Sequence, residues 1–433
     1  MKFRNVVLVD GARSAFGRGG IGKLTATRLD TAGAHIIRAL LDRNPKIKDT
    51  MIEDVGLGNI GGALEINFLC AVQRLAGLPM ESCCFVSNRQ CGSSMETLHK
   101  VALSIMVGSI DCGMALGIER MGRGLGMPDM TGSKRNGGFN PELMKMNKVQ
   151  RDMAHDHDEN YSVKIPDGIL DMLPLMAMTQ TAQNVAEMYN LSRAEIDAFA
   201  AKSHQKADEA YAKGIYKDEI IPLEVEDPVI GDDKVWVDGE KGEMIIFDRD
   251  ECIRPSTSPE KLAALKPIGG IMSPTKQDII ITPGNSCPTN DGISCAILMA
   301  EEKAIELGLE PIARIVGIGV GGVKPQLMGL GPISSTHKAC ANAGIDIEQI
   351  DRVEFNEAFA AQALPCIREL GIDEAKVNVN GGSIAIGHPI GATGTRLVTT
   401  VAMELRRSNS KYALATQCIG SGMGISTILE ALD

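Results

Sequence analysis

Short apolar runs alternate along the chain with longer segments in which apolar residues recur at helical spacing. Near the N-terminus, residues 6–9 (Val-Val-Leu-Val) are typical of a buried strand, and residues 29–41 have the spacing of an amphipathic helix. Residues 84–87 then predict a strand that leads through Cys91 into a helix over 95–107. Strands followed by helices in this order predict an α/β fold.

The same order of elements returns at the end of the chain. Residues 378–380 predict a strand that leads through a glycine-rich turn into a helix over 397–405. Residues 412–416 and 424–429 predict adjacent strands on either side of a turn that contains Cys418. We therefore expect two similar α/β halves, each with a strand-to-helix junction at which a ligand could bind.

The middle of the chain has a different composition. Residues 121–285 are rich in glycine and charge, and nine of the 22 methionines fall between Met121 and Met178. Because methionine suits irregular, adaptable contacts, this stretch predicts an inserted apolar lid. A loose helical hairpin that covers the core is an equally good interpretation, and the two are compatible.

Composition narrows the class of protein. With 433 residues, 44% hydrophobic and 23% charged, the chain fits a large soluble enzyme of two or three domains. The net charge of −11 leaves no basic stripe for a nucleic-acid backbone, so nucleic acid is not expected as a partner. Eleven cysteines without a repeated CxxC spacing predict free thiols and a cytoplasmic location. The sequence has no apolar stretch of about 18 residues, so no integral membrane segment is expected.

Two cysteines lie among small residues and differ from the others. Cys91 is followed by Gly92-Ser93-Ser94 at the expected start of a helix, where the backbone dipole and free N–H groups favour a thiolate. Cys418 begins the small-residue turn Cys418-Ile419-Gly420-Ser421-Gly422. The first is expected to act as a nucleophile and the second as an acid and base. A lone cysteine is more often a small buried hydrophobe, which is the interpretation for Cys70, Cys83, Cys84, Cys112, Cys295, Cys340 and Cys366.

Two further motifs lie between these cysteines in the sequence. Glycines at 387, 391 and 394, together with Pro389, predict an exposed turn that carries His388, whose imidazole can take the thiol proton. The second motif is Asn356-Glu357-Ala358-Phe359. Together the two motifs would supply a base and an oxyanion site.

Two other patterns do not fit the functions that they first suggest. Residues 317–322 match the GxGxxG spacing of dinucleotide sites, but Lys324-Pro325 follows at once where a helix should open. Residues 155–158 (His-Asp-His-Asp) resemble a metal-binding tract, yet they lie in the charged insert and no zinc spacing appears. We expect neither a Rossmann site nor a metal site.

The motifs together resemble those of the thiolase family, in the family's order and along nearly the whole chain. The 88–95 and 361–367 segments are most similar to the degradative 3-ketoacyl-CoA thiolases of fatty-acid β-oxidation. The segments that carry the resemblance are 9–13, 88–95, 284–286, 290–292, 356–362, 380–394 and 418–424.

The resemblance implies a five-layered αβαβα fold built from two pseudo-repeated halves and an inserted loop domain that binds coenzyme A. Residues 1–120, completed by about 286–310, would form the N-terminal half, 121–285 the loop domain and 311–433 the C-terminal half. It also implies coenzyme A as a co-substrate, no tightly bound cofactor and no metal. Acyl-CoA substrates, a homodimer or homotetramer, and a multienzyme β-oxidation partner are the implied partners.

The resemblance also implies roles for individual residues. Cys91 would attack the 3-keto carbon, His388 would accept its proton, and Cys418 would protonate the departing acetyl-CoA enolate. Charge develops on two different oxygens, so two sets of donors are needed. One set would be His388 with a water held by Asn356. The other would be the backbone N–H groups of Cys91 and Gly420.

Coenzyme contacts are implied at five positions. Arg254 falls where the family places an arginine against the nucleotide end, and Met178, Ala358 and Phe359 match positions that line the pantetheine. Cys287, followed by Pro288, replaces a Ser-Gly pair that commonly meets the pantetheine arm.

Two alternatives to the degradative activity stay open. Because condensation of two acetyl-CoA units uses the same residues, a short-chain acetyl-CoA acetyltransferase is the first alternative. Short-chain members tend to carry a histidine where this chain has Ala177. A condensing enzyme of the ketoacyl or hydroxymethylglutaryl-CoA synthase type is more distant, since it is not expected to have a cysteine at the position of Cys418.

Overall fold

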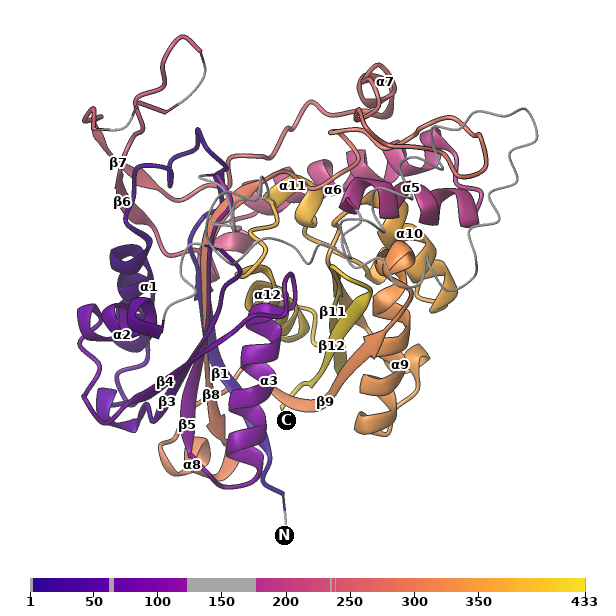
Figure 1. Cartoon of the computed structure of the whole chain (residues 1–433). Coiled ribbons are helices and arrows are strands. Elements are labelled where there is room, and N and C mark those ends of the chain that lie inside the picture. The colour runs from indigo at the N-terminus through magenta and orange to yellow at the C-terminus, as the bar shows by residue number, and fades with distance from the viewer. Residues whose placement is uncertain (1–2, 62–65, 123–176, 234–235, 238, 433) are drawn as a thin grey trace, which may run out of the picture.

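A mixed sheet of ten strands runs through the molecule (Figure 1). The structure is a computed structural model that describes residues 3–61, 66–122, 177–233, 236–237 and 239–432. Its strands are β1 Val6–Arg13, β2 Gly17–Arg18, β3 Asp54–Gly58, β4 Cys83–Ser87, β5 Cys112–Arg120, β8 Asn290–Ala300, β9 Ala313–Gly322, β10 Arg352–Phe355, β11 Tyr412–Ile419 and β12 Met423–Glu430, and β6 Leu223–Glu226 and β7 Met244–Phe247 form a separate hairpin. Its α-helices are α1 Leu29–Arg43, α2 Ile66–Leu75, α3 Ser93–Met106, α5 Met178–Met188, α6 Arg193–Ala212, α7 Pro259–Ala263, α8 Glu301–Glu306, α9 Gly331–Ala343, α10 Ala360–Glu369, α11 Ser383–Ile386 and α12 Thr393–Arg407.

The order of strands repeats in the two halves of the sheet. The whole order is β10-β11-β12-β9-β1-β8-β5-β3-β4, with β2 paired to β8. In the first half β3 is parallel to β5, and β5, β8 and β1 are antiparallel in turn. In the second half β10 is parallel to β11, and β11, β12 and β9 are antiparallel in turn. The second half therefore repeats the strand order of the first, with β9, β12, β11 and β10 in the places of β1, β8, β5 and β3. This confirms the prediction of two similar halves.

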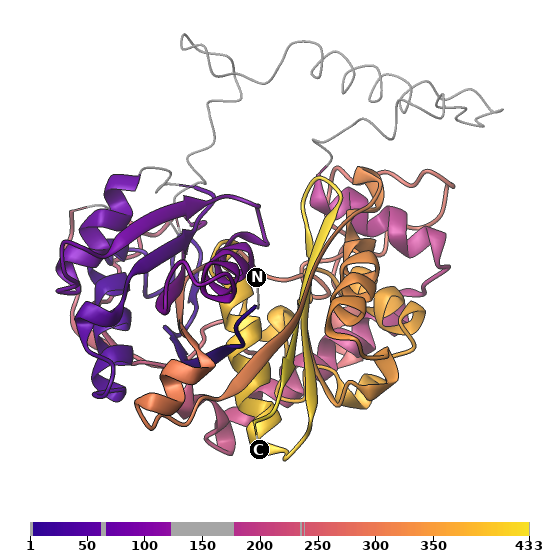
Figure 2. The ribbon, with the colours of Figure 1, turned by 90° about the horizontal axis from the view of Figure 1, so that it is seen from below.

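Helices separate and cover the two halves to give five layers. Helices α1 and α2 cover the outer face of the first half, and α9 covers the outer face of the second. Helices α3 and α12 pack against each other between the halves, as the view from below shows (Figure 2). The halves of the sheet join only where Val6, Val7 and Leu8 of β1 pair with β9. The layer order is therefore helix, sheet, helix, sheet, helix, as the thiolase resemblance implied.

Most predicted elements are present, but the predicted strand over 378–380 is wrong. Asn378 has a φ of +44°, a left-handed conformation that cannot continue a strand. Its side-chain amide takes the place of a strand partner: Asn378 Oδ1 accepts from the Phe355 N–H at 2.8 Å, and Asn378 Nδ2 donates to the Phe355 carbonyl at 2.9 Å. A polar side chain thus pairs with the end of β10 where a backbone pairing was expected.

The glycines of residues 317–322 serve packing within strand β9. A Cβ atom on Gly317 would lie 2.3 Å from the Ala339 carbonyl oxygen, and one on Gly319 would lie 2.2 Å from that of Ser335. Both oxygens belong to α9, so glycine on this face of β9 lets the helix approach the strand closely. The segment is a strand and does not open a helix, which explains why it does not form a dinucleotide site.

The middle segment contributes α5, α6, β6, β7 and α7 to the described structure. Helix α6 contacts α10 and α11 of the second half, close to the glycine-rich turn of His388. Residues 123–176 lie outside the described residues, and with them the predicted methionine-rich lid and the His-Asp-His-Asp tract. In the part of the chain that is described, no helix is long and apolar enough to cross a membrane.

Candidate active site

Cys91 lies on the sharp turn that joins β4 to α3. The preceding Gln90 has a φ of +46°, which is uncommon for a residue with a side chain and is typical of strain at a functional site. Gln90 Nε2 donates to Ser421 Oγ at 3.0 Å, and Gln417 Nε2 donates to the Cys91 carbonyl at 2.5 Å. These two bonds join the Cys91 turn to the Cys418 turn, although more than 320 residues separate them in the sequence.

Gly420 lies so close to the Cys91 turn that a larger residue would displace the side chain of Gln90. A Cβ atom at this position would lie 1.8 Å from Gln90 Oε1. The backbone N–H groups of Gly420 and of Cys91 itself donate toward the Cys91 sulfur, and both lower the thiol pKa. They are the two donors that the sequence resemblance assigned to one oxyanion site.

Burial outweighs these donors and raises the pKa of Cys91 to about 11. The N–H groups lower the pKa, as the sequence analysis expected of a helix N-terminus, but burial has the larger effect. Cys91 is half-buried, and the loss of hydration penalises a thiolate more than two N–H groups stabilise it. Cys91 therefore rests as a neutral thiol at pH 7.

The pKa of Cys91 gives a prediction for its reaction with iodoacetamide. Because the thiolate is the reactive form, the rate of Cys91 alkylation should rise about tenfold per pH unit from pH 7 to 9.5 without a plateau. The rate is measured by peptide mass mapping, since Cys83 is exposed and will also react. A plateau near neutral pH would show that the resting sulfur is already ionised.

His388 is buried, with only 4% of its surface exposed, so the exposed turn predicted from the glycines and Pro389 is wrong. Its two ring nitrogens have different partners. Thr393 Oγ1 donates to the Pro389 carbonyl at 2.8 Å, so it can only accept from His388 Nδ1, which lies 2.6 Å away. The proton is thus on Nδ1, and the lone pair is on Nε2, which faces Asn356 Nδ2 at 3.4 Å. Burial, and then the charge of Arg396, lower the pKa of His388 to about 3, so the imidazole is neutral and able to accept a proton.

Cys418, at the end of β11, completes the catalytic group. It is fully buried, and burial followed by the neighbouring Cys91, Cys366 and Cys287 raises its pKa well above the usual range. A thiol of this kind keeps its proton at neutral pH, so it suits a proton donor. The structure therefore brings Cys91 next to Gly420 and Cys418, and His388 next to Asn356, from four separate stretches of the sequence.

Four of the five predicted coenzyme contacts gather beside Cys418. Ala358 and Phe359 belong to the same apolar cluster as Cys418, and Met178 packs against that cluster. The Cys287 N–H donates to the Ala358 carbonyl at 3.0 Å, and the charge of Cys91 contributes to the raised pKa of Cys287. A cavity of about 640 Å³ is lined by residues 267–271 and 278–280, and its Ile268, Ile271 and Ile280 pack on this cluster.

Arg254 lies apart from these four residues. It is exposed on the loop before α7, and its backbone N–H donates to His204 Nδ1 of α6 at 3.2 Å. The structure therefore does not bring Arg254 together with the other four predicted coenzyme contacts.

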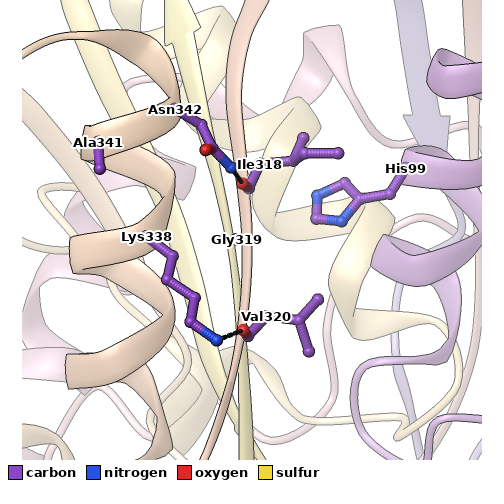
Figure 3. A pocket seen from close by; sticks show the side chains of 7 residues that line it. All are labelled: His99, Ile318, Gly319, Val320, Lys338, Ala341 and Asn342. Carbon is purple, nitrogen blue, oxygen red and sulfur yellow. Dashed lines mark hydrogen bonds between the residues drawn. The ribbon is translucent and has the colours of Figure 1, made fainter.

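A second cavity, of about 320 Å³, contains none of the predicted residues (Figure 3). It lies along the edge of β9 beyond the point where β1 has left it. Lys338 Nζ donates to the Val320 carbonyl at 2.9 Å, and Asn342 Nδ2 donates to the Ile318 carbonyl at 2.6 Å, so side chains of α9 satisfy this edge. His99 on the opposite wall pairs with Thr427 at 2.8 Å. The polar side chains of α9 in this cavity are therefore explained by their hydrogen bonds to the carbonyl groups of β9, which cover an open edge of the sheet.

The sequence analysis missed the residues that hold the two active-site loops. Buried Glu357 accepts from Ser203 Oγ at 2.7 Å, from Asn378 Nδ2 at 2.7 Å and from the Ile384 N–H at 3.1 Å. Since Ser203 belongs to α6, this carboxylate ties the middle segment to the loops of Asn356 and His388. Its place in the Asn356–Phe359 motif was the only signal in the sequence.

No group of three His, Cys, Asp or Glu side chains that could hold a metal occurs among the residues that the structure describes. All eleven cysteines are free thiols, as the sequence predicted. The burial predicted for seven of them is wrong for Cys83, which is exposed, and for Cys70 and Cys84, which are half-buried.

Comparison with known families agrees with this arrangement of residues. Residues 6–302 match the model of the thiolase N-terminal domain, and residues 309–431 match that of the thiolase C-terminal domain. The chain belongs to the thiolase family. It is therefore an acyltransferase, and the family assignment removes the support for an enzyme of the ketoacyl or hydroxymethylglutaryl-CoA synthase type.

Individual thiolases are similar to this chain over their full length. A 3-ketoacyl-CoA thiolase of Aliivibrio fischeri is 37% identical over 432 residues, which cover 99% of both chains. The crystal structure of the Bacillus anthracis acetyl-CoA acetyltransferase has a TM-score of 0.81 and 31% identity and covers 100% of both chains. Human mitochondrial 3-ketoacyl-CoA thiolase in complex with CoA has a TM-score of 0.79 and 29% identity, covering 99% of this chain and 98% of the human one.

Proposed function

We propose that this thiolase cleaves 3-ketoacyl-CoA with coenzyme A to give acetyl-CoA and an acyl-CoA two carbons shorter. The observation that supports the proposal is that Cys91 neighbours Cys418 and has the N–H groups of Cys91 and Gly420 directed at its sulfur, while His388 faces Asn356. The full-length similarity to a 3-ketoacyl-CoA thiolase supports the same substrate class.

In the first half of the reaction, Cys91 takes the acyl group. Its proton moves to His388 Nε2 as the sulfur bonds to the 3-keto carbon, because both pKa shifts oppose an ion pair at rest. The ketone oxygen then gains charge next to the Cys91 and Gly420 N–H groups. The bond between carbons 2 and 3 breaks, its electrons form the enolate of acetyl-CoA, and the Cys418 thiol protonates carbon 2. His388 and a water on Asn356 stabilise the enolate oxygen.

In the second half, coenzyme A removes the acyl group. The Cys418 thiolate takes the proton of the coenzyme A thiol, and the coenzyme sulfur attacks the acyl carbon on Cys91. The bond from that carbon to the Cys91 sulfur breaks, and His388 returns the proton to Cys91. Each residue ends in its starting protonation state, as a complete cycle requires.

The binding of coenzyme A is proposed at the residues beside Cys418. Met178, Ala358, Phe359 and Cys287 surround the place for the pantetheine arm, and Arg254 on the outer loop would face the phosphates. The complex of the human thiolase with CoA supports this ligand. A homodimer or homotetramer, a β-oxidation partner and a cytoplasmic location belong to the same proposal, and the free cysteines support the location.

Turnover of two substrates tests the proposed activity. Acetoacetyl-CoA and a 3-ketodecanoyl-CoA are each mixed with coenzyme A, and the acyl-CoA products are identified by mass. The proposal requires acetyl-CoA and octanoyl-CoA from the longer substrate. If neither substrate is cleaved, the proposed function is wrong.

We predict that chains longer than four carbons are preferred. Each buried methylene contributes about 0.8 kcal/mol, or roughly fourfold in binding, so kcat/KM should rise from the four-carbon to the eight-carbon substrate. The similarity of the Cys91 and Asn356 motifs to degradative thiolases is the basis of this prediction. A steep fall beyond four carbons, with ready condensation of acetyl-CoA, would instead support the short-chain activity named for the Bacillus anthracis enzyme.

A further inference from the structure

A chain of buried polar contacts leads from a carboxylate on β10 to the catalytic histidine. Arg396 NH1 donates to Glu354 Oε2 at 2.7 Å, and Arg396 NH2 donates to Ser383 Oγ at 2.7 Å. Ser383 Oγ donates to Asn356 Oδ1 at 2.7 Å, and Asn356 Nδ2 lies 3.4 Å from His388 Nε2. All five side chains are buried, with exposed fractions of 0 to 4%.

Donor chemistry fixes the direction of the Arg396 bond, and the need of the Ser383 hydroxyl proton for an acceptor favours one direction for the next. A guanidinium group can only donate, so Ser383 Oγ must accept from Arg396 and has its own hydroxyl proton left for Asn356 Oδ1. The oxygen of the Asn356 amide is thereby held toward Ser383. The NH₂ group must then face His388 Nε2, which is the side on which the substrate reacts.

The opposite orientation of the Asn356 amide would be harmful to the proposed chemistry. It would place Asn356 Oδ1 against the lone pair of His388 Nε2, and it would remove the donor from the site of the enolate oxygen. Replacing a polarised donor by an acceptor at that point costs stabilisation of the developing charge. In a dry site the amide can keep one orientation only if a neighbour determines it.

Helix α12 controls both nitrogens of the histidine through this arrangement. Thr393, in its first turn, accepts from Nδ1, and Arg396, one turn later, acts on the Nε2 side through Ser383 and Asn356. The Arg396 charge is balanced by Glu354, so the pair can stay buried. A single helix can therefore set the tautomer of His388 and the orientation of its amide neighbour.

We propose that Ser383 and Arg396 are positioning residues for carbon–carbon bond cleavage, which hold the Asn356 amide with its NH₂ group toward His388 and the enolate oxygen. The proposal rests on the proposed thiolase function. It predicts a defect confined to the step that forms the enolate, because acyl transfer between Cys91 and coenzyme A uses the other donors, the N–H groups of Cys91 and Gly420.

The test measures two reactions of the same variant. One is cleavage of acetoacetyl-CoA by coenzyme A, and the other is exchange of the acetyl group between acetyl-CoA and isotopically labelled coenzyme A, which forms no enolate. For Ser383→Ala we expect kcat for cleavage to fall about 10- to 100-fold, with exchange within about threefold of wild type and KM for coenzyme A unchanged. Ser383→Thr keeps the hydroxyl and should recover most of the cleavage.

Ser335→Ala is the matched control. Ser335 is also fully buried in the second half and bonds Ser426 Oγ at 2.7 Å, but it does not contact Asn356. This variant should retain both activities. Arg396→Lys, which cannot bridge Glu354 and Ser383 as the guanidinium does, should show the same selective loss as Ser383→Ala.

The outcomes separate this inference from the proposed function. If the wild-type protein carries out neither reaction, the proposed function fails. If the wild type carries out both and Ser383→Ala slows both equally, or slows neither, the positioning role is wrong. Thermal unfolding of each variant shows whether an equal loss reflects an unfolded fraction.

Discussion

Replacing Cys91 by serine is expected to abolish thiolysis, with a loss in kcat of about 10³-fold or more. A hydroxyl is far harder to ionise than a thiol, and the enclosed site already raises the pKa of the cysteine thiol to about 11. Neutral His388 cannot supply the additional driving force that a serine would need. Cleavage of acetoacetyl-CoA and the mass of the intact protein after incubation with acyl-CoA are the measurements.

The control for this substitution is Cys83→Ser. Cys83 is the exposed cysteine that precedes the Cys91 turn on β4, and its replacement should leave turnover unchanged. Cys91→Ser should also lose alkylation at position 91 alone. Acyl transfer near the wild-type rate, or acylation mapped to a different cysteine, would contradict the assignment of the nucleophile.

Replacing Cys418 by alanine is expected to separate the two steps of the reaction. The variant lacks the acid that protonates the enolate and the base for coenzyme A, so cleavage should fall about 10²- to 10⁴-fold. The nucleophile stays in place, and slow acylation of Cys91 from a simple acyl-CoA should survive. Two quantities are measured: the amount of acyl-enzyme, from the mass of the intact protein, and the rate of cleavage.

Cys366→Ala is the control for the side-chain volume that Cys418→Ala removes from the core. Cys366 is another fully buried cysteine of the second half, and its Sγ contacts the Gly329 carbonyl at 3.2 Å. It should lose some stability and keep both steps. If Cys418→Ala instead retains cleavage and loses only acylation, the roles of the two cysteines are reversed.

The local spacing of apolar residues was sufficient to predict most of the helices and strands that position the site. The helical spacing of 29–41 and 95–107 predicted α1 and α3, and the apolar runs 412–416 and 424–429 predicted β11 and β12, because each pattern has the period of its element. The strand expected at 378–380 was wrong for a reason outside that pattern. Asn378 pairs through its side chain with Phe355, and no local rule shows which distant backbone an amide will meet.

By itself the sequence determined the family and the fold class. It also predicted a catalytic set, because the residues concerned lie in short motifs whose small neighbours and order are specific: Cys91, His388, Asn356, Gly420 and Cys418. Only the tertiary structure decided how those residues are tuned. Burial raises the thiol pKa of Cys91 where a helix N-terminus predicted a thiolate, and it keeps His388 neutral. Desolvation depends on every segment that packs around a group, and many of these segments are distant from it in the sequence.

The same holds for the polar contacts that orient the catalytic side chains. Ser383 and Arg396 look ordinary in the sequence, and their roles arise because α11 and α12 bring them to Asn356 and Glu354 of the β10 segment. A hydrogen bond needs a partner within about 3 Å at the right angle, and such partners are set by the packing of whole layers. Motifs therefore predicted which residues react, while the fold determined their surroundings and their hydrogen-bond partners.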